Sequence, residues 1–165
     1  LIYVAIRFEY RFATAGVLAL VHDSLITIGL FSVLQLEVNS AFVAAILTII
    51  GYSINDTIVV FDRIRDNLKR RGKEGLDGLA NRSINETFVR SINTSMTAFL
   101  AITAIFLFGG ATTRDFSLAL MIGILVGTYS SICVATPIWL AWRKHDERLR
   151  AAGGSKALTP RTNRG

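Results

Sequence analysis

The stretch that decides the fold is Gly51-Tyr52-Ser53-Ile54-Asn55-Asp56-Thr57-Ile58-Val59-Val60-Phe61-Asp62-Arg63-Ile64-Arg65. It begins as an apolar segment and ends as a charged one that faces water. Within it, Asp56 follows Asn55 and has apolar sequence on both sides. Because a carboxylate at membrane depth is energetically costly, Asp56 is a candidate functional residue.

The composition of the whole chain is that of a membrane protein. Of its 165 residues 52% are hydrophobic, and the mean hydropathy is +0.47. Charges are clustered, and the gaps between the clusters match the roughly 20 apolar residues that a helix needs to span a bilayer. We therefore predict an all-α transmembrane helix bundle. Its four full helices are expected at about 12–34, 41–61, 88–111 and 116–142.

The two ends of the chain differ from these spans. Residues 1–6 are apolar but too short to span a membrane, and they lack the basic start and cleavage site of a signal peptide. We expect them to be the end of a fifth, truncated helix, so that the sequence is a fragment of a longer protein. Residues 1–144 are predicted to form one transmembrane domain, and 145–165 a flexible cytoplasmic tail.

The basic residues predict the orientation in the membrane. All but one of the 18 Lys and Arg residues lie before residue 12, between residues 63 and 90, or after residue 142. The positive-inside rule places these segments, including the C-terminus, in the cytoplasm. The net charge of +6 therefore indicates topology and contact with anionic lipid. We expect no nucleic-acid partner.

Several polar residues fall inside the predicted spans. In the first span Asp23 either faces the bundle interior as a titratable or hydrogen-bonded group, or caps a local packing defect. In the second, Gly51 allows close approach of a neighbouring helix. The third span carries a polar stripe that is unlikely to face lipid, made by Arg90, Asn93, Thr94 and Thr97.

The sequence also indicates where the third span starts and how the fourth span packs. Ser83-Ile84-Asn85-Glu86 fits a capping box, which predicts that the third helix starts in water at about Ser83. In the fourth span Pro137 is a candidate kink. That span also carries small residues at every fourth position, which favour close helix packing: Ala119, Gly123, Gly127, Ser131 and Ala135.

No pattern typical of an enzyme is present. The sequence has no nucleotide-binding loop, nucleophile elbow or metal-ligand helix, and its one cysteine, Cys133, cannot form a disulfide or a metal cluster within the chain. We therefore expect no catalytic residues, no metal and no cofactor other than protons.

Asp56 and Arg90 are expected at similar depths in the membrane on consecutive helices, which makes the pair a candidate proton relay. Asp56 lies six residues inside Asp62, at a depth of roughly 9 Å, and Arg90 lies four residues inside Glu86, roughly 6 Å deep. An arginine beside the acid favours its charged form, and a dry site without the arginine favours its neutral form. A helix movement that makes and breaks the pair would therefore load and unload a proton. The alternative is a static ion pair that fixes helix register.

Four further polar residues are expected to support this pair by holding water or orienting it. They are Asn55, Asn93, Thr94 and Thr97.

The segment Thr48–Arg65 closely resembles the SecF family of protein-export membrane proteins, or the SecF half of a fused SecDF. The resemblance extends over His22-Asp23, over Arg90–Ser95 and over the Gly-rich last helix. It implies a membrane protein of the resistance-nodulation-division type. In that family the acid of the Asn-Asp pair and the arginine that opens the next helix are the proton-relay groups, and these positions are Asp56 and Arg90 here.

The resemblance also implies partners and a place in the cell. A SecF-type protein works with SecD beside the SecYEG channel in a bacterial or archaeal inner membrane, where it promotes preprotein export with the proton motive force. The family has a first helix and a periplasmic domain before the region present here. Two other functions remain open: a passive scaffold of the translocase, and a proton-coupled drug or lipid transporter of the same superfamily.

Overall fold

A computed structural model describes residues 10–72 and 74–156, and within them it places the side chains of all but 112 and 150–156. The predicted helix end at residues 1–6 lies outside the described part. The described residues form helices joined by short turns, which confirms the all-α prediction. The elements are α2 (Tyr10–Val33), α3 (Ser40–Lys69), α4 (Leu76–Phe108), α5 (Ala111–Ser130), the π-helical turn η1 (Ser131–Ala135) and α6 (Thr136–Lys156).

Four helical segments are long and apolar enough to cross a membrane. They are Tyr10–Val33, Ser40–Lys69, Leu76–Phe108 and Thr113–Leu149, the last of which runs from α5 through η1 into α6. They match the four predicted spans in number. Most of them extend further than predicted, because the charged turns next to the apolar segments remain helical.

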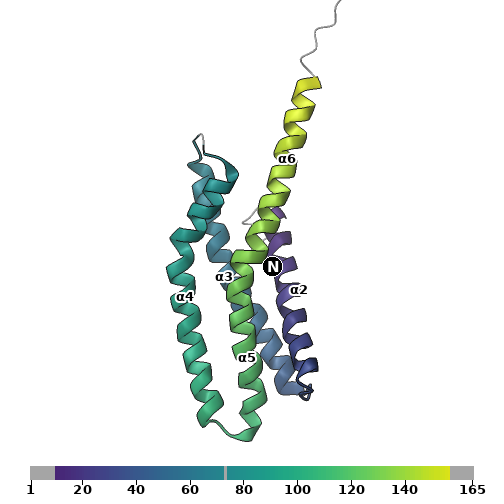
Figure 1. The fold of residues 1–165 in the computed structure, drawn as a ribbon, viewed down its shortest axis with the longest axis vertical. Coiled ribbons are helices and arrows are strands. Elements are labelled where there is room, and N and C mark those ends of the chain that lie inside the picture. The colour runs from purple at the N-terminus through teal and green to yellow at the C-terminus, as the bar shows by residue number, and fades with distance from the viewer. Residues whose placement is uncertain (1–9, 73, 157–165) are drawn as a thin grey trace, which may run out of the picture.

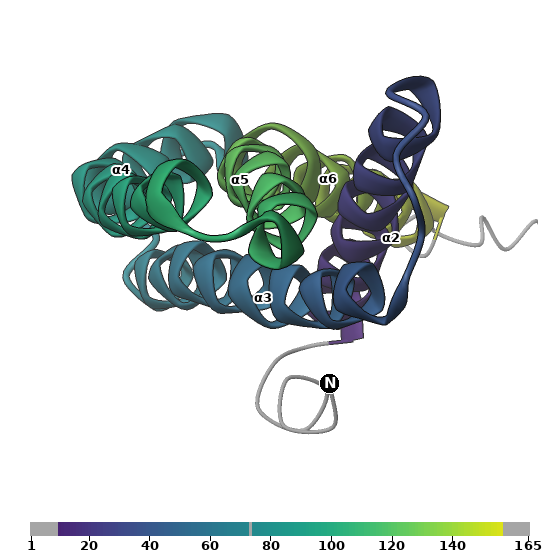
Figure 2. The same cartoon turned by 90° about the horizontal axis from the view of Figure 1, so that it is seen from below.

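The α3 and α5 helices pack together at the centre, with α2 on one side and α4 on the other (Figure 2). The turn between α3 and α4 lies at the same end of the bundle as α6, which extends beyond the other helices (Figure 1). The α2–α3 and α4–α5 turns lie at the opposite end. Both outer helices can therefore bring side chains to the central pair.

Two apolar clusters hold the ends of the bundle. Near α6, Phe12 stacks on Trp139 with ring centroids 5.0 Å apart, and both rings are almost completely buried. Near the α2–α3 turn, Phe31 packs on Phe42 at 4.4 Å, beside Ile49 and Ala119. The helix segments between these clusters contain the buried polar residues.

The capping-box prediction at Ser83 is wrong. The α4 helix begins at Leu76, because Leu76, Leu79 and Ala80 are buried in the cluster near α6 and extend the helix. Ser83 lies inside the helix, where its hydroxyl donates to the Leu79 carbonyl at 2.8 Å. It also accepts a hydrogen bond from the Asn67 amide at 2.9 Å.

The second capping-box residue, Glu86, links α4 to α3. Its carboxylate accepts hydrogen bonds from Asn67 at 2.8 Å and from Arg63 at 2.6 Å. Glu86 precedes the span predicted at 88–111.

The last span is not a continuous α-helix. Pro137 has no N–H to donate to the Cys133 carbonyl, and the chain widens into the π turn η1 directly before it. In this turn the Thr136 hydroxyl donates to the Ser131 carbonyl at 3.0 Å.

The predicted tail is helical over most of its length. The α6 helix continues to Lys156, and the remaining residues, 157–165, lie outside the described part. Ion pairs hold α6 to α2, to α4 and to the segment between α3 and α4. Glu147 pairs with Arg71 at 2.7 Å, Lys144 with Asp77 at 2.6 Å, and Asp146 with Arg11.

Candidate functional site

Asp56 lies inside the bundle and is bound by serine hydroxyls from two other elements. Its side chain projects from α3, and the residue is 8% exposed. Ser91 of α4 donates a hydrogen bond to Oδ1 at 2.7 Å, and Ser131 of η1 donates to Oδ2 at 2.5 Å. The carboxylate thus connects the central helices to α4.

Asp23 lies in a similar environment on the other side of the central pair. The residue is 1% exposed. Its Oδ2 accepts hydrogen bonds from Ser53 of α3 at 2.5 Å and from Ser130 of α5 at 2.7 Å. Its Oδ1 lies 3.1 Å from Nδ1 of His22. Of the alternatives for Asp23, the structure shows an interior, hydrogen-bonded group.

The two carboxylates share their supporting elements. Ser130 and Ser131 are consecutive residues at the junction of α5 and η1, and each binds one of the two acids. Ser53, which binds Asp23, lies three residues before Asp56 on α3, so both face the same side of that helix. The site is therefore one buried polar layer between the two apolar clusters.

The structure does not bring Arg90 to Asp56. Arg90 is exposed, and within the described part of the chain Asp56 is bound by serines rather than by a cation. The physical reason is helical geometry. Ser91 already faces Asp56, and neighbouring residues on a helix point about 100° apart.

The expected supporting residues are also exposed. Asn55 on α3 and Asn93, Thr94 and Thr97 on α4 lie on the surface. The Thr94 and Thr97 hydroxyls donate to the carbonyls of Arg90 and Asn93 at 2.9 and 2.8 Å, within their own helix. On α4, Arg90, Asn93, Thr94 and Thr97 lie three or four residues apart and form an exposed polar face on a bundle whose surface is otherwise largely apolar, and Asn55 is a further exposed polar residue on α3.

The predicted packing glycines divide into two groups. A Cβ added to Gly123 would overlap the Ile49 side chain, and one added to Gly127 would lie 3.1 Å from the Ser53 Cβ. These glycines let α5 approach α3 closely. Gly51 makes no such approach to any described residue, since it is exposed and a Cβ there would have open space.

Sequence reasoning missed the role of the serines. Ser53, Ser91 and Ser130 were not singled out, and Ser131 was predicted only as a packing residue. A partial signal exists, because Ser53 lies in the same stretch as Asp56 and Ser91 directly follows Arg90. Within the described residues, no three His, Cys, Asp or Glu side chains lie close enough together to hold a metal.

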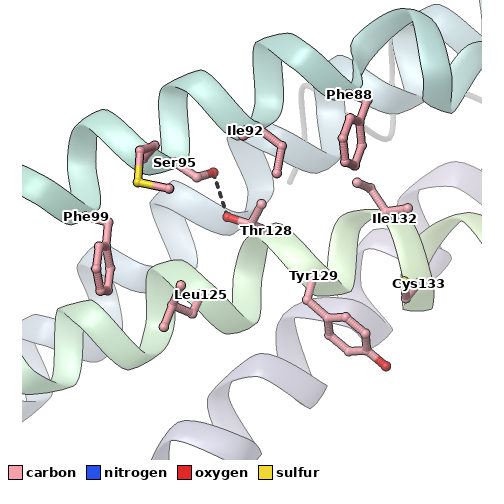
Figure 3. Close-up of a pocket in the computed structure, with 10 residues that line it drawn as sticks. Phe88, Ile92, Ser95, Phe99, Leu125, Thr128, Tyr129, Ile132 and Cys133 are labelled. Carbon is pink, nitrogen blue, oxygen red and sulfur yellow. Dashed lines mark hydrogen bonds between the residues drawn. The ribbon is translucent and has the colours of Figure 1, made fainter.

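An apolar groove of about 390 Å³ lies between α4 and α5 (Figure 3). Phe88, Phe99 and Tyr129 are among its lining residues. Its polar contacts include Thr128, whose hydroxyl donates to Ser95 at 2.6 Å. Ser95 also accepts a hydrogen bond from Tyr52 at 3.0 Å, which connects the groove wall to α3.

Comparison with known proteins identifies similar sequences over most of the chain. The family model described as "Protein export membrane protein SecD/SecF, C-terminal" matches residues 1–145. The chain is 49% identical over 162 residues to the protein translocase subunit SecF of Alicyclobacillus acidocaldarius, covering 96% of this chain and 53% of that protein. It is 47% identical over 146 residues to SecDF of Bacillus subtilis, covering 87% of this chain and 20% of that protein.

Solved structures agree with these sequence matches. A crystal structure of SecDF in a super-membrane-facing form matches with a TM-score of 0.89 at 47% identity, covering 92% of this chain and 21% of that one. SecDF from a Thermus species matches with a TM-score of 0.83 at 49% identity, covering 87% of this chain and 20% of that one. The chain spans about half the length of the SecF relatives that it matches.

Proposed function

This chain belongs to the SecD/SecF C-terminal family of protein-export membrane proteins, and from that premise we propose that it is a proton-driven accessory subunit of the Sec translocase. In this role it promotes preprotein export across the bacterial or archaeal inner membrane, with its C-terminus in the cytoplasm. Asp56 is the group that takes up and releases the proton.

The observation that carries this proposal is the serine environment of Asp56. A hydroxyl donates to an ionised carboxylate and accepts from a protonated one. Ser91 and Ser131 at 2.7 and 2.5 Å can therefore satisfy Asp56 in either state. A static ion pair needs a cation at the acid, and in this conformation Arg90 is exposed. The arrangement supports a relay more than a passive scaffold.

Arg90 acts by exchanging places with Ser91. The two residues are neighbours on α4, so a rotation of this helix by about 100° brings the guanidinium toward Asp56 and moves the hydroxyl away. A cation beside the acid favours its ionised form and expels the proton. Proton binding therefore favours the conformation seen here, and proton release favours the rotated one.

The exposed polar face supports SecD as the direct partner. An arginine and several amides and hydroxyls facing acyl chains would be costly. We propose that this α4 face, formed by Arg90, Asn93, Thr94 and Thr97, packs against the SecD bundle, whether separate or fused. We propose contact with SecYEG and with the preprotein only for the full-length protein, because the chain spans about half the length of the SecF relatives that it matches.

A proton-coupled transporter of the same superfamily is the alternative that the groove favours. Three aromatic residues line the groove, as a drug or lipid site would require. Its lining residues carry no ionisable acid or base with which to recognise a charged headgroup or drug, apart from the weakly acidic Tyr129 and Cys133. The groove is therefore weaker support for a transporter function than the buried serine site is for proton coupling.

Export driven by a proton gradient tests the proposal. Full-length protein with its partners is placed in inverted membrane vesicles, with Asp56→Asn or Arg90→Met. Asp115→Asn and Arg148→Met serve as matched controls, since these residues lie near the two ends of the bundle, away from the site. We expect both site variants to assemble normally and to lose the stimulation of export by the proton gradient. Wild-type stimulation in an assembled Asp56→Asn variant rules out the relay.

A further inference from the structure

We infer that Asp23 is a second proton-binding carboxylate of this bundle, and that Ser130 and Ser131 couple its protonation to that of Asp56. The coupling rests on the proposed function, in which Asp56 takes up a proton. The proton site at Asp23 itself stands on the geometry around that residue. It would extend the proton network to α2, a helix that the Asp56–Arg90 relay does not include.

Among the residues that the structure describes, none supplies a permanent counter-charge to the buried Asp23. The groups that face it are His22 on its own helix, Ser53 on α3 and Ser130 on α5. On α2 the nearest described arginine, Arg11, lies at the end of the helix and pairs with Asp146 of α6. An ionised carboxylate in such a site has only hydroxyls and a histidine to stabilise it, and protonation removes the cost of burying its charge.

The titratable neighbours of Asp23 are His22 and Asp56. His22 is the only described group within ion-pair distance, and it carries charge only when protonated. Asp56 is the other buried acid, on the adjacent helix α3, and it has the same sign of charge when ionised. The α5 and η1 elements contribute only the hydroxyls of Ser130 and Ser131 to this layer, and α4 contributes that of Ser91.

The two consecutive serines have the geometry of reversible donors. Ser130 Oγ lies 2.7 Å from Asp23 Oδ2 and 3.2 Å from the Gly127 carbonyl. Ser131 Oγ lies 2.5 Å from Asp56 Oδ2 and 3.0 Å from the Thr128 carbonyl. Each hydroxyl thus has one hydrogen and two acceptors within reach.

This geometry accommodates a proton on either acid. When Asp23 is ionised, Ser130 donates its hydrogen to Oδ2. When a proton binds Oδ2, the carboxylic O–H donates to Ser130 Oγ, and the serine hydrogen turns to the Gly127 carbonyl. Ser131 can make the same change between Asp56 and the Thr128 carbonyl, so neither state leaves these groups unpaired.

Because Ser130 and Ser131 are adjacent in the chain, the protonation of Asp23 is coupled to that of Asp56. Ser130 and Ser131 share a peptide bond, and Ser53 lies on the same side of α3 as Asp56. Two negative charges in one buried layer repel each other, so we expect a proton on one acid to favour ionisation of the other. A movement that alters the Asp56 site therefore changes the proton affinity of Asp23 as well.

Infrared difference spectroscopy as a function of pH tests the inference. Full-length protein with its SecD-type partner is measured in lipid membranes, and the probe is the C=O stretch of protonated carboxylic acids. We expect Asp23→Asn to remove one pH-dependent band and to move the midpoint of the Asp56 band by about one pH unit. Asp56→Asn should remove the other band and move that of Asp23. Asp115→Asn is the matched control and should leave both bands in place.

The possible results separate this inference from the proposed function. An Asp23→Asn variant that keeps every pH-dependent band overturns the second proton site. Loss of one band with no movement of the Asp56 midpoint overturns the coupling. A wild-type protein in which Asp56 contributes no band overturns the proton role of Asp56 instead, whereas a band that Asp23→Asn removes would still support the proton site at Asp23.

A second variant keeps the test valid if Asp23→Asn does not fold. Ser130→Ala retains both acids and the Cβ packing, but removes one donor from Asp23 Oδ2. We expect a change in the C=O frequency of the pH-dependent band that Asp56→Asn leaves in place, which is assigned to Asp23 by elimination, while the frequency of the Asp56 band stays in place. An unchanged frequency means that Ser130 does not bind the protonated acid, which overturns the proposed link.

Discussion

The serines around Asp23 and Asp56 can both donate and accept a hydrogen bond, which neither an arginine nor an apolar side chain can do at those positions. Each brings one hydrogen and one acceptor to a buried acid, with distances of 2.5 to 2.7 Å. Hydrogen bonds to a charged group contribute about 1.5–3 kcal/mol each. Losing one donor is therefore a measurable change in the stability of the folded bundle.

Ser53→Ala tests this contribution at a single residue. The alanine keeps the Cβ that packs near Gly127 and removes only the hydroxyl that donates to Asp23. We expect the variant to unfold with a free energy lower by about 1–3 kcal/mol, measured by thermal or denaturant unfolding in detergent. Ser32→Ala is the matched control, because Ser32 is exposed near the end of α2. Equal stability of the two variants would contradict the role of Ser53.

The close approach of α3 and α5 holds the two acids in one layer. It depends on Gly123, where a Cβ would overlap Ile49, and on Gly127, where a Cβ would press on Ser53. Proteins tolerate added atoms poorly at such contacts, because the neighbouring helix must shift. A shift of α5 would move Ser130 and Ser131 away from their carboxylates.

Gly123→Ala is therefore expected to lower the free energy of unfolding by about 1–3 kcal/mol, measured in the same way. Gly29→Ala is the control, because a Cβ on Gly29 meets nothing within 4 Å and alanine favours a helix. Adding Ile49→Ala to Gly123→Ala makes room for the new methyl group, so the double variant should lose less stability than the two single losses together. Simple additivity would mean that the two side chains do not meet.

At the scale of the whole molecule, the bundle is asymmetric. Its interior contains the two serine-bound acids, whereas the exposed polar face on α4 has no covering within the described part of this chain. Exposed leucine, isoleucine and valine side chains dominate the outer side of α2, which suits acyl chains. This difference predicts that a second bundle contacts only one side of the molecule.

Cysteine cross-linking tests this orientation in the full-length complex, after the native Cys133 is replaced by alanine. We expect Asn93→Cys and Thr97→Cys to cross-link to suitably placed cysteines in the SecD bundle, with Leu25→Cys on the exposed side of α2 as the control. The polar residues would otherwise face lipid at a cost, so covering them favours the complex. Cross-links from Leu25→Cys alone would place SecD on the opposite side and contradict this assignment.

The number of spans and the two buried acids were predictable from the sequence. A run of apolar residues long enough to cross a bilayer is a local property, and it does not depend on which helices are neighbours. A carboxylate within such a run is costly wherever it points, so Asp23 and Asp56 stand out in the sequence itself. Their partners carry no such signal, because a serine inside a helix can bond its own backbone at little cost.

Tertiary structure decided which way each polar residue faces. One step along a helix is about 100°, so depth alone could not tell that Ser91 rather than Arg90 meets Asp56. Packing also overrode the capping signal at Ser83, because burying Leu76 and Leu79 against the cluster near α6 extends α4. The sequence by itself determined how many helices form and which acids they bury. Only packing determined their hydrogen-bond partners, because those partners come from helices that are distant in the chain.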